Sequence, residues 1–237
     1  MTRSAQDPEP PGRAPGDAPK RGIPIVVSAP SGTGKTSVCR ALVTRDPRIE
    51  FSVSHTTRAA RPGEQDGVDY HFVDEQTFLA LVKAEHFLEH AEYSGSLYGT
   101  SHAAIDGPLA EGRDVLLEIE VQGAGQVRER RPDARFIFLV PPSLAALEAR
   151  LRGRGTDGPD VISRRLAVAD NELSAVRRFD YVVVNDRLED AIAAVAEILA
   201  AERSGRRGDV VARYGRETAL ARGAGALAEL RPEPPPA

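Results

Sequence analysis

IPIVVSAPSGTGKT, at residues 23–36, is the part of the sequence from which the fold can be worked out. Residues 23–29 form an apolar, β-branched run that is typical of a strand buried on both faces. Glycines follow, and the residues from Lys35 to about Arg45 favour a helix that Pro47 ends. A buried strand, a glycine-rich turn and a helix in this order suit a bound phosphate, because their N–H groups can converge on an anion.

The phosphate-binding loop in this segment departs from the usual pattern at one position. Gly-x4-Gly-Lys-Ser/Thr would place a glycine at position 29, where the chain has alanine. We expect the loop to work if this position needs no positive φ. Lys35 would then reach the β- and γ-phosphates of ATP, and Thr36 would bind Mg²⁺. The predicted ATP phosphate site comprises Ala29, Pro30, Ser31, Gly32, Thr33, Gly34, Lys35 and Thr36.

The rest of the chain continues the alternation of strands and helices. Further buried strands are predicted at residues 115–121, 135–140 and 181–184, and helices at about 144–151, 161–176 and 188–201. This order predicts an α/β fold with a doubly wound parallel sheet of the P-loop NTPase type. Residues 55–112 are instead polar, aromatic and irregular, apart from a helix at about 75–83 with Asp74 as its N-cap.

The composition narrows the classes of protein to consider. The chain has 237 residues, 41% of them hydrophobic and 28% charged, as in a globular domain with an ample core. A net charge of −4 gives no general attraction to nucleic acid or to acidic membranes. One cysteine excludes an internal disulfide, and no apolar run is as long as a membrane-spanning helix. We therefore expect a soluble cytoplasmic protein.

Both ends of the chain are expected to lie outside the folded core at residues 23–203. Residues 1–22 are rich in proline and are predicted to be a disordered tail. Residues 204–237 form a basic tail, with seven arginines against four acidic residues when counted from Arg203. We expect this tail to be solvated, with at most a short helix at about 217–230.

Four motifs downstream of the loop are similar to the nucleotide-binding elements of the guanylate kinase family. They are SVSHTTRAARPGE at residues 52–64, GVDYHFV at 67–73, FLEH at 87–90 and YGT at 98–100. The resemblance covers residues 23–203. It implies a GMP-binding subdomain inserted at about 55–112 and a helical lid at about 148–168.

The resemblance also implies a role for each matching residue. Two arginines and a tyrosine would bind the GMP phosphate, since guanidinium forks suit a phosphate dianion. Glu89 would accept from guanine N1–H and the 2-amino group, a donor pair that adenine lacks. Ser54 and Thr100 would donate to guanine O6, with Tyr98 packed beside them. The GMP site so implied comprises Ser54, Arg58, Arg61, Tyr70, Glu89, Tyr98, Thr100 and Glu118.

The segment LLEIEVQG at residues 116–123 resembles the second acidic strand of the family. Its acidic positions hold Glu118 and Glu120, where family members commonly carry aspartate. Glu118 would reach either the guanine pocket or, through water, Mg²⁺; a structural salt bridge is the alternative. The lid resemblance rests on RLRGRGT at residues 150–156 and on the following helix. It implies that Arg150, Arg154 and Arg165 act with Lys35 as catalytic residues.

These motifs together imply phosphoryl transfer from ATP to GMP, with Mg²⁺ accompanying ATP. One alternative is a non-catalytic binding module of the same family, but such modules tend to lose the loop lysine and the lid arginines. Another is a sugar-phosphate kinase of the same fold, which should lack the guanine-binding set. The sequence leaves the oligomeric state open.

Overall fold

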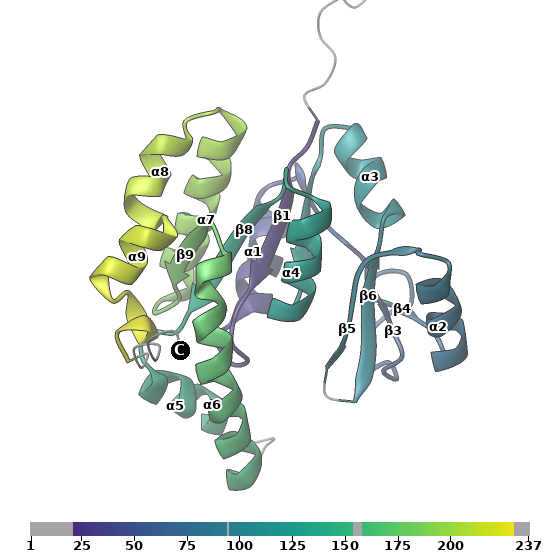
Figure 1. Cartoon of the computed structure of the whole chain (residues 1–237), viewed down its shortest axis with the longest axis horizontal. Helices are drawn as coiled ribbons and strands as arrows, with labels where there is room; N and C mark the ends of the chain where they lie inside the picture. The colour runs from purple at the N-terminus through teal and green to yellow at the C-terminus, as the bar shows by residue number, and fades with distance from the viewer. Residues whose placement is uncertain (1–20, 94, 154–157, 230–237) are drawn as a thin grey trace, which may run out of the picture.

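The core of the protein is a five-stranded parallel sheet with helices on both faces (Figure 1). The computed structural model describes residues 21–93, 95–153 and 158–229. In the order β2-β7-β1-β8-β9, the first strand of the chain lies at the centre. The doubly wound α/β architecture is thus confirmed. The strands are β1 (Pro24–Ser28), β2 (Ile49–Phe51), β7 (Asp114–Glu118), β8 (Arg135–Val140) and β9 (Tyr181–Val184).

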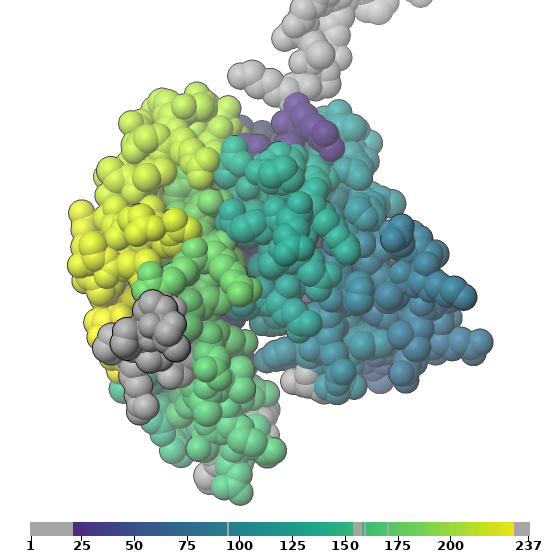
Figure 2. Space-filling model, in the orientation of Figure 1, coloured from purple at the N-terminus to yellow at the C-terminus, as the bar shows by residue number. Residues whose placement is uncertain are grey.

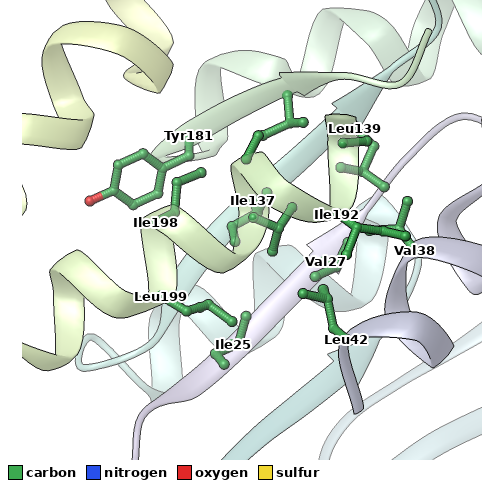
Figure 3. Close-up of a cluster of buried hydrophobic side chains, with 14 of the residues drawn as sticks. Ile25, Val27, Val38, Leu42, Ile137, Leu139, Tyr181, Ile192, Ile198 and Leu199 are labelled. Carbon is green, nitrogen blue, oxygen red and sulfur yellow. The ribbon is translucent and has the colours of Figure 1, made fainter. Parts of the chain in front are cut away.

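Strand β1 shows why the sheet is covered on both sides. Side chains alternate across a strand, so Ile25 and Val27 face one layer of helices and Val26 faces the other. All three have no exposed surface. Figure 3 shows Ile25 and Val27 among side chains of the first layer. The layers are α1 (Lys35–Arg45) with α7 (Leu188–Arg203), and α3 (Ala103–Ala110) with α4 (Val121–Arg130).

A second, four-stranded sheet lies beside the first, where the GMP-binding insertion is predicted (Figure 1). Its α2 helix (Glu75–Lys83) has the predicted bounds, and the Asp74 side chain caps it by accepting from the backbone N–H of Thr77 at 2.7 Å. Phe78 of this helix stacks on Phe87 with ring centroids 4.7 Å apart. The strands, in the order β4-β3-β6-β5, are β3 (His55–Thr56), β4 (His71–Phe72), β5 (Phe87–Tyr93) and β6 (Ser96–Ser101).

The predicted lid corresponds to two helices that pack on each other, at the lower end of the molecule in Figure 2. They are α5 (Leu144–Gly153) and α6 (Pro159–Ser174), followed by the short 3-10 helix η1 (Ala175–Arg178). Leu147, Leu151 and Ile162 form a small apolar cluster between them. This cluster is separate from the two core layers, whereas Leu173 near the end of α6 is buried in one of them. The outer parts of the two helices can therefore move at a smaller cost in buried surface than the parts next to the core. Residues 154–157 lie outside the described residues.

The expectation of a solvated C-terminal tail is wrong for residues 207–229, although the short helix expected at about 217–230 is present in part. Here the chain forms α8 (Arg207–Tyr214), α9 (Arg216–Arg222) and the 3-10 helix η2 (Gly225–Glu229), with Val210 and Leu227 buried against the core. The few apolar side chains are spread over short helices, which is why the composition alone suggested a tail. Residues 230–237 and 1–20, and with them nearly all of the tail predicted at 1–22, lie outside the described residues.

Two arginines of this C-terminal segment, Arg207 and Arg213, form ion pairs with acidic residues of preceding elements. The Arg207 guanidinium lies 3.4 Å from the Glu202 carboxylate and 3.7 Å from that of Asp180. At the far end, the backbone N–H of Leu144 donates to the Glu229 carboxylate at 2.9 Å. The segment therefore braces both the sheet and the start of α5. None of the helices in the described ranges has the length and apolar character needed to cross a membrane.

Three histidine rings meet in the second sheet. The His55 ring centroid lies 4.6 Å from that of His71 and 5.8 Å from that of His86. Within the part of the chain that the structure describes, the buried Nδ1 of His55 has no hydrogen-bond partner. Burial, and then repulsion from the other two histidines, lowers the pKa of His55 from 6.5 to about 4, although Asp66 opposes the shift.

This lowered pKa predicts a loss of stability in acid. The unfolded chain protonates His55 near 6.5 and the folded protein near 4, so the free energy of unfolding falls as the pH drops through this window. Between about pH 7 and pH 5, we expect the free energy of unfolding to fall less in His55→Gln than in wild type, by on the order of 1 kcal/mol. Urea unfolding across this range measures it, with exposed His102→Gln as control. An unchanged acid dependence in H55Q would contradict the prediction.

Candidate active site

The phosphate loop leaves the carboxyl end of β1 and runs directly into α1. Gly32 and Gly34 have φ values of 92° and 99°, which side chains rarely adopt. Ala29 is buried and is not among the described residues with positive φ. Alanine is therefore compatible with the first position of the loop. Asn185, at the end of β9, holds the loop from behind by donating from Nδ2 to the Thr33 carbonyl at 2.7 Å.

Lys35 projects from the start of α1 towards the carboxyl end of β7. Its ammonium donates to the Ile119 carbonyl and to the Glu120 carboxylate, each at 3.0 Å, and its side chain is 12% exposed. Burial alone would lower the pKa of Lys35, but Glu120 and Glu118 outweigh it, so the pKa is raised. A full positive charge is thereby held beside the phosphate loop.

Thr36 and Glu118 supply oxygen atoms on the other side of the loop. The Thr36 hydroxyl donates to the Glu118 carboxylate, which directs both groups to the same point. A hydroxyl and a carboxylate are hard ligands of the kind that Mg²⁺ prefers. Since Mg²⁺ also binds nucleotide phosphates, two protein oxygens are a sufficient set for it. The structure thus pairs Glu118 with the phosphate side of the site.

On the acceptor side, Glu89 is buried in a pocket of hydroxyl groups. It is 3% exposed, and the Thr100 hydroxyl donates to its Oε1 at 2.6 Å. The Ser54 and Thr100 hydroxyl oxygens lie 2.9 Å apart. While Glu89 is ionised, the one proton of Thr100 is committed to it, so Ser54 is the donor in the contact between the two hydroxyls. The Ser54 hydroxyl has to rotate away from Thr100 before it can donate to a ligand. Burial raises the pKa of Glu89 to about 7, against a lowering by its contacts with Thr100.

One cavity of about 350 Å³ joins the phosphate loop to this pocket. Its wall includes Lys35 from the loop side and Glu89 from the acceptor side, so two ligands can meet end to end inside it. Of the residues predicted to bind ATP phosphates or GMP, the cavity wall contains Ala29, Pro30, Ser31, Gly32, Gly34, Lys35, Thr36, Ser54, Arg61, Tyr70, Glu89, Tyr98 and Glu118.

Three of the residues predicted to bind ATP phosphates or GMP lie outside this wall, namely Thr33, Arg58 and the fully buried Thr100. Thr33 is fully buried under the loop. Arg58 lies with its guanidinium carbon 5.4 Å from the centre of the Tyr70 ring, and it donates to the Glu64 carboxylate at 2.8 and 3.0 Å. The same carboxylate accepts from the backbone N–H of Arg61 at 2.7 Å. Glu64 therefore fixes the loop that carries both arginines.

The predicted lid arginines occupy different places. Arg165 on α6 lines the cavity. Arg150 on α5 donates to the carbonyls of Asn185 and Asp186 at 2.8 and 3.0 Å, behind the phosphate loop, and is not part of the wall. Arg154 lies outside the described residues. Of the two lid arginines that the structure describes, Arg165 is thus the one brought to the cavity in this conformation.

Glu172 is a residue of this site that the sequence motifs did not reveal. Its carboxylate accepts from the backbone N–H of Ser31 at 3.4 Å, which puts a negative group where a phosphate oxygen would bind. Burial, and then the nearby Glu120, raises the pKa of Glu172 to about 7. The available signal was spacing, because Glu172 follows Arg165 by two helical turns and so shares its face of α6.

Comparison with known proteins agrees with this geometry. The family model described as guanylate kinase matches residues 21–202. The guanylate kinase of Hahella chejuensis is 51% identical over 183 residues, or 77% of this chain and 88% of that protein. A guanylate kinase of Thermus thermophilus is 52% identical over 212 residues, or 89% and 94%. The crystal structure of guanylate kinase from Anaplasma phagocytophilum covers 86% of this chain and 96% of its own, with 34% identity and a TM-score of 0.65. Because these matches extend over the whole folded core, the chain belongs to the guanylate kinase family.

Proposed function

We propose that this protein transfers the γ-phosphoryl group of ATP to the phosphate of GMP, giving ADP and GDP. The observation that carries the proposal is the single cavity whose wall holds Lys35 at one side and Glu89 at the other. A nucleoside triphosphate on the loop and a guanine beside Glu89 would bring their phosphates together. The GMP phosphate oxygen is then the nucleophile, and no covalent enzyme intermediate is required.

On the donor side, the loop N–H groups and the Lys35 ammonium would hold the ATP phosphates and offset the charge of the migrating group. Thr36 and Glu118 are the residues that would hold Mg²⁺, which adds positive charge at the ATP phosphates when it is bound. ATP would also displace the Glu172 carboxylate from the Ser31 N–H, since both anions compete for one donor. That exchange frees α6 to bring Arg165 towards the phosphates.

On the acceptor side, an ionised Glu89 would accept from guanine N1–H and from the 2-amino group. Ser54 would donate to guanine O6, while Thr100 orients Glu89. Arg61 and Tyr70 would bind the GMP phosphate, with Arg58 reaching it by exchanging Glu64 for the stronger phosphate dianion. Tyr98 would close the pocket over the base.

The lid would exclude water once both nucleotides are bound, so that ATP is transferred rather than hydrolysed. Arg165 and Arg154 are proposed to stabilise charge on the transferred group. Arg150 would connect the lid to the nucleotide by way of the Asn185 and Asp186 carbonyls that it binds. The one cysteine, Cys39, is buried in α1 and free, which suits the reducing cytoplasm in which we place the reaction.

A coupled assay that offers GMP, AMP, UMP and dTMP with ATP tests the proposal. We expect turnover with GMP to exceed that with the other acceptors by at least about 10³ in kcat/KM, because they lack the donor pair that Glu89 reads. Loss of transfer in the presence of a chelator would support the need for Mg²⁺. Equal use of AMP, or binding of GMP with no transfer at all, would refute the proposed reaction.

A further inference from the structure

Gly123 lies in the first turn of α4 and lines the cavity near Glu89. It is buried, and it is not among the described glycines with positive φ, so the backbone there is open to any residue. Glycine destabilises a helix by about 1 kcal/mol relative to alanine. Backbone conformation therefore gives no reason for glycine at this position, whereas the space beside it does.

The Glu89 carboxylate occupies that space. A Cβ built on Gly123 would lie 2.3 Å from Glu89 Oε2 and 3.1 Å from its Cδ, which is too close for non-bonded atoms. The next atom, a methyl carbon of Ile119, is 3.6 Å away, an ordinary contact. A side chain at position 123 would therefore collide with one group alone, the carboxylate proposed to read guanine.

The Glu89 carboxylate cannot move away from a side chain at position 123 without losing its orientation. On its other side it is held by the hydroxyl of Thr100, which is itself fully buried. The pairing of β5 with β6 shifts register between Phe87 and Glu89, a bulge of the kind that turns a side chain inwards. The carboxylate also lies against the first turn of α4, where the helix dipole favours negative charge.

We propose that Gly123 is a specificity-determining residue, because the absence of a side chain there holds the Glu89 carboxylate at the edge of the guanine base. This inference rests on the proposed function of Glu89. It predicts that a single methyl group, placed outside the base-binding contacts, disrupts recognition of guanine while leaving the ATP side intact.

The experiment compares Gly123→Ala with Gly125→Ala in the same helix. A Cβ at Gly125 would meet only the Arg178 guanidinium, at 3.8 Å, so this variant makes the same chemical change without the collision. For G123A we expect kcat/KM for GMP to fall at least about tenfold, with the KM for ATP changed less than about twofold. The preference for GMP over IMP, which lacks the 2-amino group, should shrink by a similar factor. G125A should behave as wild type.

Two further measurements separate this inference from the proposed function and from simple misfolding. NMR titration of the Glu89 carboxyl carbon in nucleotide-free protein should show a changed midpoint in G123A but not in G125A. In the double variant Glu89→Ala with Gly123→Ala, the added methyl group should no longer lower the melting temperature relative to Glu89→Ala alone.

The possible outcomes are distinct. A wild-type protein that does not phosphorylate GMP refutes the proposed function, while the titration still decides whether Gly123 sets the Glu89 carboxylate. A wild-type GMP to IMP preference and an unshifted Glu89 midpoint in G123A would overturn the inference. So would an equal loss in G125A, or a G123A defect that persists when residue 89 is alanine.

Discussion

Replacing Lys35 with alanine should lower the rate of phosphoryl transfer about a thousandfold and leave the protein folded. The ammonium is held at the phosphate loop by the Ile119 carbonyl and the Glu120 carboxylate, so its charge is in place before ATP arrives. Removal of one such preorganised group costs on the order of 10²–10³ in rate, or about 4 kcal/mol at the upper end. Glu120 is left unpaired but is 32% exposed, so water can solvate it.

Single-turnover transfer at saturating ATP and GMP measures this effect, because it reports the chemical step without product release. Lys83→Ala is the matched control, since it removes the same side chain from the exposed end of α2. Thermal unfolding should give similar midpoints for K35A and wild type. A K35A rate within about tenfold of wild type would rule out the catalytic role of Lys35.

Replacing Glu89 with glutamine should lower kcat/KM for GMP by roughly 10³ and remove most of the preference for guanine. The glutamine amide would place an N–H group against guanine N1–H and the 2-amino group, which are themselves donors. Two buried donors that face each other leave both hydrogen bonds unmade, and this is costly. Glu92→Gln is the control, since Glu92 lies on the same strand but is exposed. An unchanged preference for GMP in E89Q would exclude Glu89 as the residue that reads guanine.

The raised pKa of Glu89 makes this effect depend on pH. Guanine needs the ionised carboxylate, so apparent GMP affinity should fall as the pH drops below about 7, and E89Q should lack this part of the dependence. The stability of the folded protein depends on pH in the opposite direction. Because the folded pKa lies above the unfolded value of 4.5, ionisation of Glu89 costs stability as the pH rises from 4.5 through about 7. E89Q should therefore melt at a higher temperature than wild type at about pH 8.

Local patterns in the sequence predicted the donor half of this molecule well. The strand, loop and helix at residues 24–45 are close to the predicted bounds, because buried β-branched runs, glycines and helix formers act over a few residues. The α2 helix and its Asp74 cap were also predicted correctly, because they too depend on residues close together in the sequence. The resemblance of four short motifs to a known family then predicted the acceptor residues, several of which the structure gathers around one cavity.

Local sequence patterns do not predict contacts between segments that are far apart in the chain. Glu172 meets Ser31 across 141 positions, and Arg150 meets Asn185 across 35, so neither contact leaves a trace in local composition. Short helices with few apolar residues, such as α8 and α9, are stable only when they pack on the surface of the core and form ion pairs with acidic residues there. The C-terminal segment was misjudged for this reason.

By itself, the sequence determined that the chain forms a doubly wound α/β domain with a phosphate loop, because those features depend on residues close together in the chain. Tertiary structure decided how the loop's Lys35 and the buried Glu89 come to share one cavity. It also decided why position 123 has no side chain, since only the folded packing of α4 against β5 brings the Glu89 carboxylate to that glycine. Chemistry at the level of single atoms depends on such non-local packing, whose distances no sequence spacing specifies.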